Sequence, residues 1–97
     1  MLALARALAV DPKVVIADEM SLGLAPLVVR RLLRAVRAAA DGGCAVLLVE
    51  QHVRMALGIA DHVVVMQRGR VQIAGPAAEL ATRVTEIEAS YLSQRMR

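Results

Sequence analysis

The chain has 97 residues, a formal net charge of +3 and 58% hydrophobic residues, with one aromatic residue, Tyr91, and one cysteine. A chain of this length is one small domain or a piece of a larger one, since so short a chain buries only a modest share of its surface. The lone cysteine excludes an intrachain disulfide. The longest apolar run, 44–49, falls far short of the roughly 20 residues of a membrane-spanning helix, so we expect no span.

The first half of the chain predicts a helix, a strand, a second helix and a second strand. Residues 1–9 predict an amphipathic helix, and 13–18 contains the continuous β-branched run 14–16, typical of a buried parallel strand. Pro26 suits the first position of a helix that Gly42-Gly43 ends, and 45–49 is a second buried strand. The apolar residues at helical spacing in the second helix are Val29, Leu32, Leu33, Val36 and Ala40.

The second half predicts shorter elements. A helix over 53–60 precedes a strand over 62–66, which the turn at 68–70 joins to 71–74 as an antiparallel hairpin. A short helix over 77–81 follows. Thr85 and Glu88 form a capping box for a last helix, whose apolar residues are Ile87, Tyr91 and Leu92.

Strands that alternate with helices predict an α/β fold with right-handed parallel connections, in one continuous segment. Ligands bind such sheets at the carboxyl ends of the strands, which places the chemistry at 18–24 and 50–52. Asp18 and Glu19 end the first strand. There Asp18 can hold Mg²⁺ while Glu19 orients or deprotonates an attacking water. Taken alone, such a pair is more often two solvated carboxylates where a strand meets a loop.

The residues on both sides of Asp18 and Glu19 favour the nucleotide-binding interpretation of this pair. The segment DPKVVIADEMSLGLAP, residues 11–26, resembles the Walker B motif and D-loop of ABC ATPases, and SLGLAP is similar to the form found in subunits of branched-chain amino-acid importers. MLALARAL resembles the helix after the signature motif. VLLVEQH, ADHVVVMQRGRVQIAG and PAAEL resemble the switch strand, final hairpin and C-terminal helix. The resemblance implies that residues 1–97 are a partial ABC ATPase domain, the C-terminal part of a P-loop NTPase fold.

The resemblance also implies roles for individual residues. Asp18 corresponds to the Mg²⁺-associated aspartate and Glu19 to the catalytic carboxylate. The D-loop that touches a second ATPase subunit corresponds to Ser21, Leu22 and Gly23. Gln51 takes the place of the usual switch histidine; it can hydrogen-bond a phosphate oxygen or the water but cannot carry an imidazolium charge.

Two neighbouring positions depart from the family's pattern. His52 follows Gln51, and a shift of one position at a strand end turns a side chain to the opposite side, so we interpret His52 as structural. Met20 stands where the family has a proline. Losing the ring that fixes φ loosens the turn and leaves the chemistry intact in principle.

The sequence contains no GxxxxGK[ST] segment, whose backbone N–H groups and lysine hold nucleotide phosphates, and no LSGGQ signature. ATP and Mg²⁺ are the ligands of the intact family domain. We expect this chain alone to bind neither and to have no independent catalysis. The family's partners are a second ATPase subunit and transmembrane permease subunits, and its location is cytoplasmic, peripheral on the inner face of the cell membrane.

Three hypotheses follow. The chain is a truncated ATPase subunit, inactive alone, from an importer of branched-chain or related amino acids; or it pairs with another ABC subunit or a separately encoded N-terminal half as a split ATPase. The third is a small regulatory or nucleic-acid-binding module that uses the arginines of the second predicted helix. The scarcity of aromatic residues for base stacking disfavours it, and we predict no nucleic-acid partner. Those arginines are Arg30, Arg31, Arg34 and Arg37.

Overall fold

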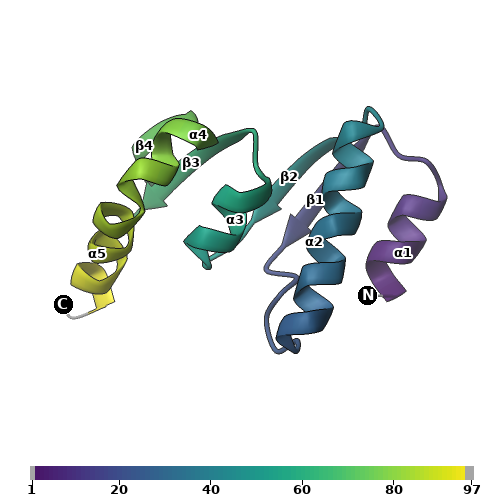
Figure 1. Cartoon of the computed structure of the whole chain (residues 1–97), viewed down its shortest axis with the longest axis horizontal. Coiled ribbons are helices and arrows are strands. Elements are labelled where there is room, and N and C mark those ends of the chain that lie inside the picture. Colours follow the sequence, from purple (N-terminus) through teal and green to yellow (C-terminus); the bar gives the residue numbers. More distant parts are fainter. Residues whose placement is uncertain (1, 96–97) are drawn as a thin grey trace. The chain divides into compact units, whose positions relative to one another are not determined.

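A computed structural model describes residues 2–95 of the chain, and the side chains of residues 3–89. The described chain divides into two compact units, one ending at Gln51 and the other beginning at His52 (Figure 1). Each unit has its own helices, its own pair of strands and its own buried residues.

The first unit has the predicted order of elements. It contains α1 (Leu2–Ala9), β1 (Val14–Asp18), α2 (Pro26–Asp41) and β2 (Ala45–Val49). The two strands pair in parallel, in a register that runs from Val14 opposite Ala45 to Asp18 opposite Val49. This confirms the predicted parallel α/β arrangement. Because the strands are parallel and in register, Asp18 and the residues after Val49 lie at the same edge of the sheet.

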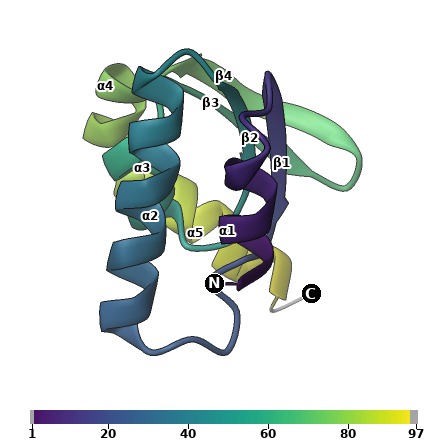
Figure 2. The same ribbon diagram turned by 90° about the vertical axis from the view of Figure 1, so that its right-hand side faces the viewer.

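The core of the first unit lies between one face of this sheet and the helices. Figure 2 shows α2 on one side of the two strands. Its apolar stripe has the helical spacing predicted, since side chains three and four positions apart share a helix face. The buried residues of the first unit's core are Leu4, Val15, Ala17, Val29, Leu32, Leu33 and Val36.

The ends of α2 follow from local chemistry. Pro26 stands at the first turn, where its missing N–H removes a donor that would have no partner within the helix. At the other end the Gly42 N–H donates to the Ala38 oxygen over 3.0 Å. Gly43 then adopts φ +105°, a backbone conformation that favours glycine and lets the chain turn back into β2.

The prediction that both strands are buried is wrong for the outer face of the sheet, which is exposed. Exposure alternates along β1, and on the outer face Ile16 is 70% exposed and Leu47 57% exposed. The reason is that successive strand residues point to opposite faces and only one face is covered in the described part of the chain. Val14 and Val49 are exposed on the same pattern. Cys44, the first residue of the apolar run 44–49, is half-buried.

The second unit begins with α3 (Val53–Ile59) and contains the predicted antiparallel hairpin of β3 (His62–Gln67) and β4 (Arg70–Pro76). Arg68 and Gly69 form its turn, both with positive φ. The hairpin leads into α4 (Ala77–Leu80), the 3₁₀ helix η1 (Ala81–Arg83) and α5 (Val84–Arg95).

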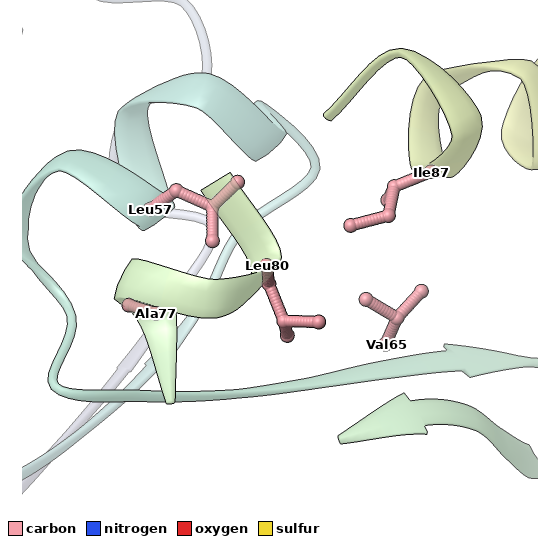
Figure 3. Close-up of a cluster of buried hydrophobic side chains, with 5 residues drawn as sticks. All are labelled: Leu57, Val65, Ala77, Leu80 and Ile87. Carbon is pink, nitrogen blue, oxygen red and sulfur yellow. The ribbon is translucent and has the colours of Figure 1, made fainter. Parts of the chain in front are cut away.

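A small apolar cluster holds the second unit together. Figure 3 shows Val65 of β3, Leu80 of α4 and Ile87 of α5 pointing toward one another, with Leu57 and Ala77 beside them. Ile87 is fully buried. On the surface, Arg54 Nε of α3 lies 2.7 Å from Glu88 Oε1 of α5. The apolar cluster therefore contains residues of α3, α4 and α5 and of the hairpin.

The capping box predicted at Thr85 and Glu88 is wrong. α5 begins at Val84 and continues directly from η1, so Thr85 lies inside the helix and not at its N-cap. Glu88, the other residue of the predicted box, is paired with Arg54. The 3₁₀ turn supplies the helix with a preceding turn, which removes the need for a side-chain cap. The side chains of Tyr91 and Leu92, also assigned to this helix, lie outside those the structure describes.

The exposed ion pair of Arg83 and Glu86 should have a measurable effect on the pKa of Glu86. Arg83 Nη2 lies 2.7 Å from Glu86 Oε1, and this hydrogen bond, with the Coulomb attraction, lowers the pKa of Glu86. Any stabilisation from the pair is fully present above the pKa of Glu86 in the unfolded chain and is lost as pH falls through the folded value. We expect a lower Glu86 midpoint in the native chain than in Arg83→Met, measured by carboxyl-carbon NMR; equal midpoints would contradict the pairing.

Candidate functional site

The loop after β1 has a strained first residue. Glu19 adopts φ +50°, a conformation uncommon for residues other than glycine, which costs of order 1–3 kcal/mol where the surroundings impose it. Its N–H donates to the Val49 oxygen over 2.8 Å, which extends the ladder between β1 and β2 by one residue. The Leu22 N–H then donates to the Glu19 oxygen over 3.2 Å. Glu19 is thus fixed at the carboxyl edge of the sheet.

Side-chain hydrogen bonds join this loop to the residues after β2. Gln51 Nε2 donates to Glu19 Oε1 over 2.9 Å. Ser21 Oγ donates to Glu50 Oε2 over 2.6 Å, and the Gln51 N–H donates to Glu50 Oε1 over 3.0 Å. The two segments that sequence analysis singled out are therefore in direct contact through their side chains.

The predicted site residues are not all equally accessible. Asp18 is exposed at the end of β1, Glu19 is half-buried and Gln51 is exposed. Leu22, 74% exposed, and Gly23 lie at the surface of the loop. Ser21 is only 6% exposed, because its hydroxyl turns inward to Glu50. The structure thus brings Glu19, Ser21 and Gln51 into one hydrogen-bonded group and leaves the loop tip facing outward.

Glu50 is the member of this group to which sequence analysis gave no role. It lay within the segment 50–52 where chemistry was expected, but only Gln51 was assigned a function there. Its signal in the sequence was its position, since an acid directly after one parallel strand meets the loop that follows the neighbouring strand.

The carboxylates at this edge of the sheet provide some of the ligands that a divalent cation needs, but not a complete set. Among the described residues, no group of three or more His, Cys, Asp or Glu side chains could hold a metal by itself. Mg²⁺ is commonly bound by one or two carboxylates together with water and substrate phosphates. Asp18 and Glu19 follow one another at the carboxyl edge of the sheet, so the residues present fit a Mg²⁺ ion that a nucleotide helps to hold.

The structure also describes His52 and Met20, the residues that follow Gln51 and Glu19 in the sequence. His52 is the exposed N-cap residue of α3, and its backbone oxygen accepts a hydrogen bond from the Ala56 N–H over 3.1 Å. Met20 is half-buried within the turn that follows Glu19. The turn forms without a proline at this position, as its hydrogen bond from the Leu22 N–H shows.

Comparison with curated proteins finds relatives along most of the chain, although no family model matches it. It is 37% identical over 92 residues to the high-affinity branched-chain amino acid transport ATP-binding protein BraG of Pseudomonas aeruginosa, covering 95% of this chain and 39% of that protein. It is 42% identical over 87 residues to the energy-coupling factor transporter ATP-binding protein EcfA2 of Symbiobacterium thermophilum, covering 90% and 30%. The chain thus spans between 30% and 39% of these relatives' lengths.

Comparison with solved structures also finds ATP-binding proteins of ABC transporters. A nucleotide-free ATP-binding cassette from an ABC transporter matches 86% of this chain and 33% of its own, with a TM-score of 0.74 and 26% identity. CbiO1 of Clostridium perfringens, part of an ABC transporter complex, matches 93% and 36%, with a TM-score of 0.72 and 28% identity. The fold is that of part of an ABC ATPase domain. The predicted fold class is thereby confirmed, and the chain is related to the ATP-binding subunits of ABC transporters.

None of the helices in the described part of the chain is both long enough and apolar enough to cross a membrane.

Proposed function

We propose that this chain supplies the hydrolytic part of an ATP site in an ABC importer for branched-chain or related amino acids. The observation that carries the proposal is the hydrogen bond of 2.9 Å from Gln51 Nε2 to Glu19 Oε1, at the carboxyl edge of the parallel strands. It places a carboxylate and an amide side by side where an α/β fold binds its ligand. Such a pair can orient a water and take its proton.

Each residue of the proposed site has a distinct task. Asp18, at the end of the Walker B strand, would hold Mg²⁺ together with the nucleotide. Mg²⁺, when bound, supplies positive charge against the phosphate oxygens. Glu19 would orient the attacking water and accept its proton, and Gln51 would donate a hydrogen bond to the water or to a phosphate oxygen. Gln51 remains neutral, so the site works without an imidazolium charge at this position.

The substrate class rests on two similarities. The segment SLGLAP resembles that of branched-chain amino-acid importers, and the Pseudomonas aeruginosa relative is named for branched-chain amino acid transport. Other relatives are named for different cargo, such as hypophosphite and nickel. The importer function is therefore supported by more relatives than the amino-acid specificity is.

The proposed assembly places the chain against other subunits. Leu22 and Gly23 form the exposed D-loop tip and would contact a second ATPase subunit, while Ser21 holds the loop from inside. Transmembrane permease subunits would complete the transporter, with this chain peripheral on the inner face of the cell membrane. In this proposal, residues 1–97 are part of one ABC ATPase domain, and polypeptide outside them holds the phosphates.

The exposed outer face of the β1–β2 sheet favours the second candidate, half of a split ATPase. Parallel sheets are normally covered on both faces, and here Val14, Ile16, Leu47 and Val49 form an apolar outer face. A separately encoded N-terminal half could cover it and bring the missing phosphate-binding loop. The two candidates differ in whether that half is covalently joined.

A chimera tests both candidates. The 92 matched residues of the Pseudomonas aeruginosa relative are replaced by those of this chain, and ATP hydrolysis is measured with Mg²⁺. We expect the chimera to hydrolyse ATP and this chain alone to show no Mg-ATP binding at micromolar concentration by calorimetry. An inactive chimera that folds and binds Mg-ATP would contradict the proposal. Activity on mixing this chain with the rest of the relative as a separate chain would favour the split ATPase.

A further inference from the structure

Glu50 joins two segments that lie 29 positions apart in the sequence. Its Oε2 accepts the 2.6 Å hydrogen bond from Ser21 Oγ, in the loop after β1. Its Oε1 accepts the 3.0 Å hydrogen bond from the Gln51 N–H, at the end of β2. One carboxylate therefore fixes both the loop that begins with Glu19 and the backbone of Gln51.

The bond to Ser21 is the stronger anchor. A hydroxyl that donates to a carboxylate makes a shorter and stronger hydrogen bond than one between neutral groups. Ser21 is 6% exposed, so water cannot readily replace Glu50 as its acceptor. The Glu50 side chain is thus held in one position from the inside of the unit.

Glu50 is linked to the Glu19 carboxylate through Gln51. With its backbone tied to Glu50, Gln51 directs Nε2 to Glu19 Oε1 over 2.9 Å. We propose that Glu50 is a positioning residue that holds Gln51, and through it Glu19, in the geometry needed for hydrolysis. This inference rests on the proposed function for the task of Glu19, and on the structure alone for the hydrogen bonds that link the three residues.

The link can be tested in the full chain without nucleotide. Glu50→Ala removes both acceptors, and we expect amide hydrogen exchange at Gln51 to rise about tenfold or more. We also expect the Gln51 side-chain amide resonances to move toward those of an exposed glutamine. Exchange at Leu33, in the buried face of α2, should change by a smaller factor. Equal changes at Gln51 and Leu33, or an unchanged Gln51, would overturn the inference.

Two further variants keep the test decisive if Glu50→Ala does not fold. Ser21→Ala removes only the inner anchor and should raise Gln51 exchange about threefold to tenfold. Glu50→Gln keeps one oxygen acceptor and should retain part of the parent protection. Glu79→Gln, an exposed acid in the second unit, is the matched control and should leave Gln51 unchanged. Failure of Ser21→Ala to affect Gln51 would overturn the inference.

The catalytic consequence is measured in the chimera. Glu50→Ala should lower kcat for ATP about tenfold to a hundredfold while KM changes less than about threefold, with partial recovery in Glu50→Gln. Loss of hydrolysis in Glu19→Gln together with an unchanged kcat in Glu50→Ala would refute the positioning role alone. Unchanged hydrolysis in Glu19→Gln would refute the proposed function, whatever Glu50 does.

Discussion

Replacing Glu19 by glutamine in the chimera is expected to lower kcat for ATP hydrolysis by about 10²–10⁴-fold, the usual contribution of a positioned general base. Glutamine has nearly the same shape and keeps the Oε1 atom that accepts the hydrogen bond from Gln51 Nε2. It cannot accept a proton from water. The variant therefore removes the proposed chemistry while leaving the hydrogen-bonded group in place.

The two kinetic constants separate this role from a structural one. Since Glu19 is proposed to act on the water and Asp18 to hold the ion, KM for Mg-ATP should change by less than about threefold in Glu19→Gln. Steady-state phosphate release measures both constants. Glu79→Gln makes the same chemical change at an exposed position of α4 and should keep full activity. Equal losses in the two variants would show that Glu19 has no special part in hydrolysis.

The sequence was sufficient to predict the covered half of the first unit. The spacing of Val29, Leu32, Leu33 and Val36 specifies a helix face, and this face is buried. The run after Lys13 specifies a strand, and it pairs in parallel as expected. These predictions succeed because they depend on local periodicity, which a single segment of chain determines.

The exposed sheet face and Glu50 depend instead on what surrounds a segment. Alternation of exposure along β1 cannot be read from VVIA, because all four residues are apolar and burial on the second face requires another layer. The bond between Ser21 and Glu50 joins residues distant in sequence. The sequence placed Glu19 and Gln51 at one sheet edge, but their direct hydrogen bond is a product of the tertiary structure.

Replacing Leu32 by alanine in the full chain is expected to reduce the free energy of unfolding by about 2–5 kcal/mol. Leu32 is 2% exposed, so removing its side-chain methyl groups leaves a cavity beneath α2 as well as losing buried apolar surface. Folded domains are commonly stable by only about 5–15 kcal/mol, so this change would remove a large share of the free energy of unfolding. Urea denaturation followed by far-UV circular dichroism measures the difference.

Leu27 provides the matched control for that measurement. It lies in the same helix and is 58% exposed, so Leu27→Ala makes the same chemical change without creating a cavity. Its effect should stay within about 0.5 kcal/mol, the usual range for surface substitutions. A similar loss in both variants would mean that the Leu32 face of α2 is not packed against the sheet in solution. If only Leu32→Ala is destabilised, the first unit has an ordered core of its own, and this core supports the edge of the sheet that carries Asp18 and Glu19.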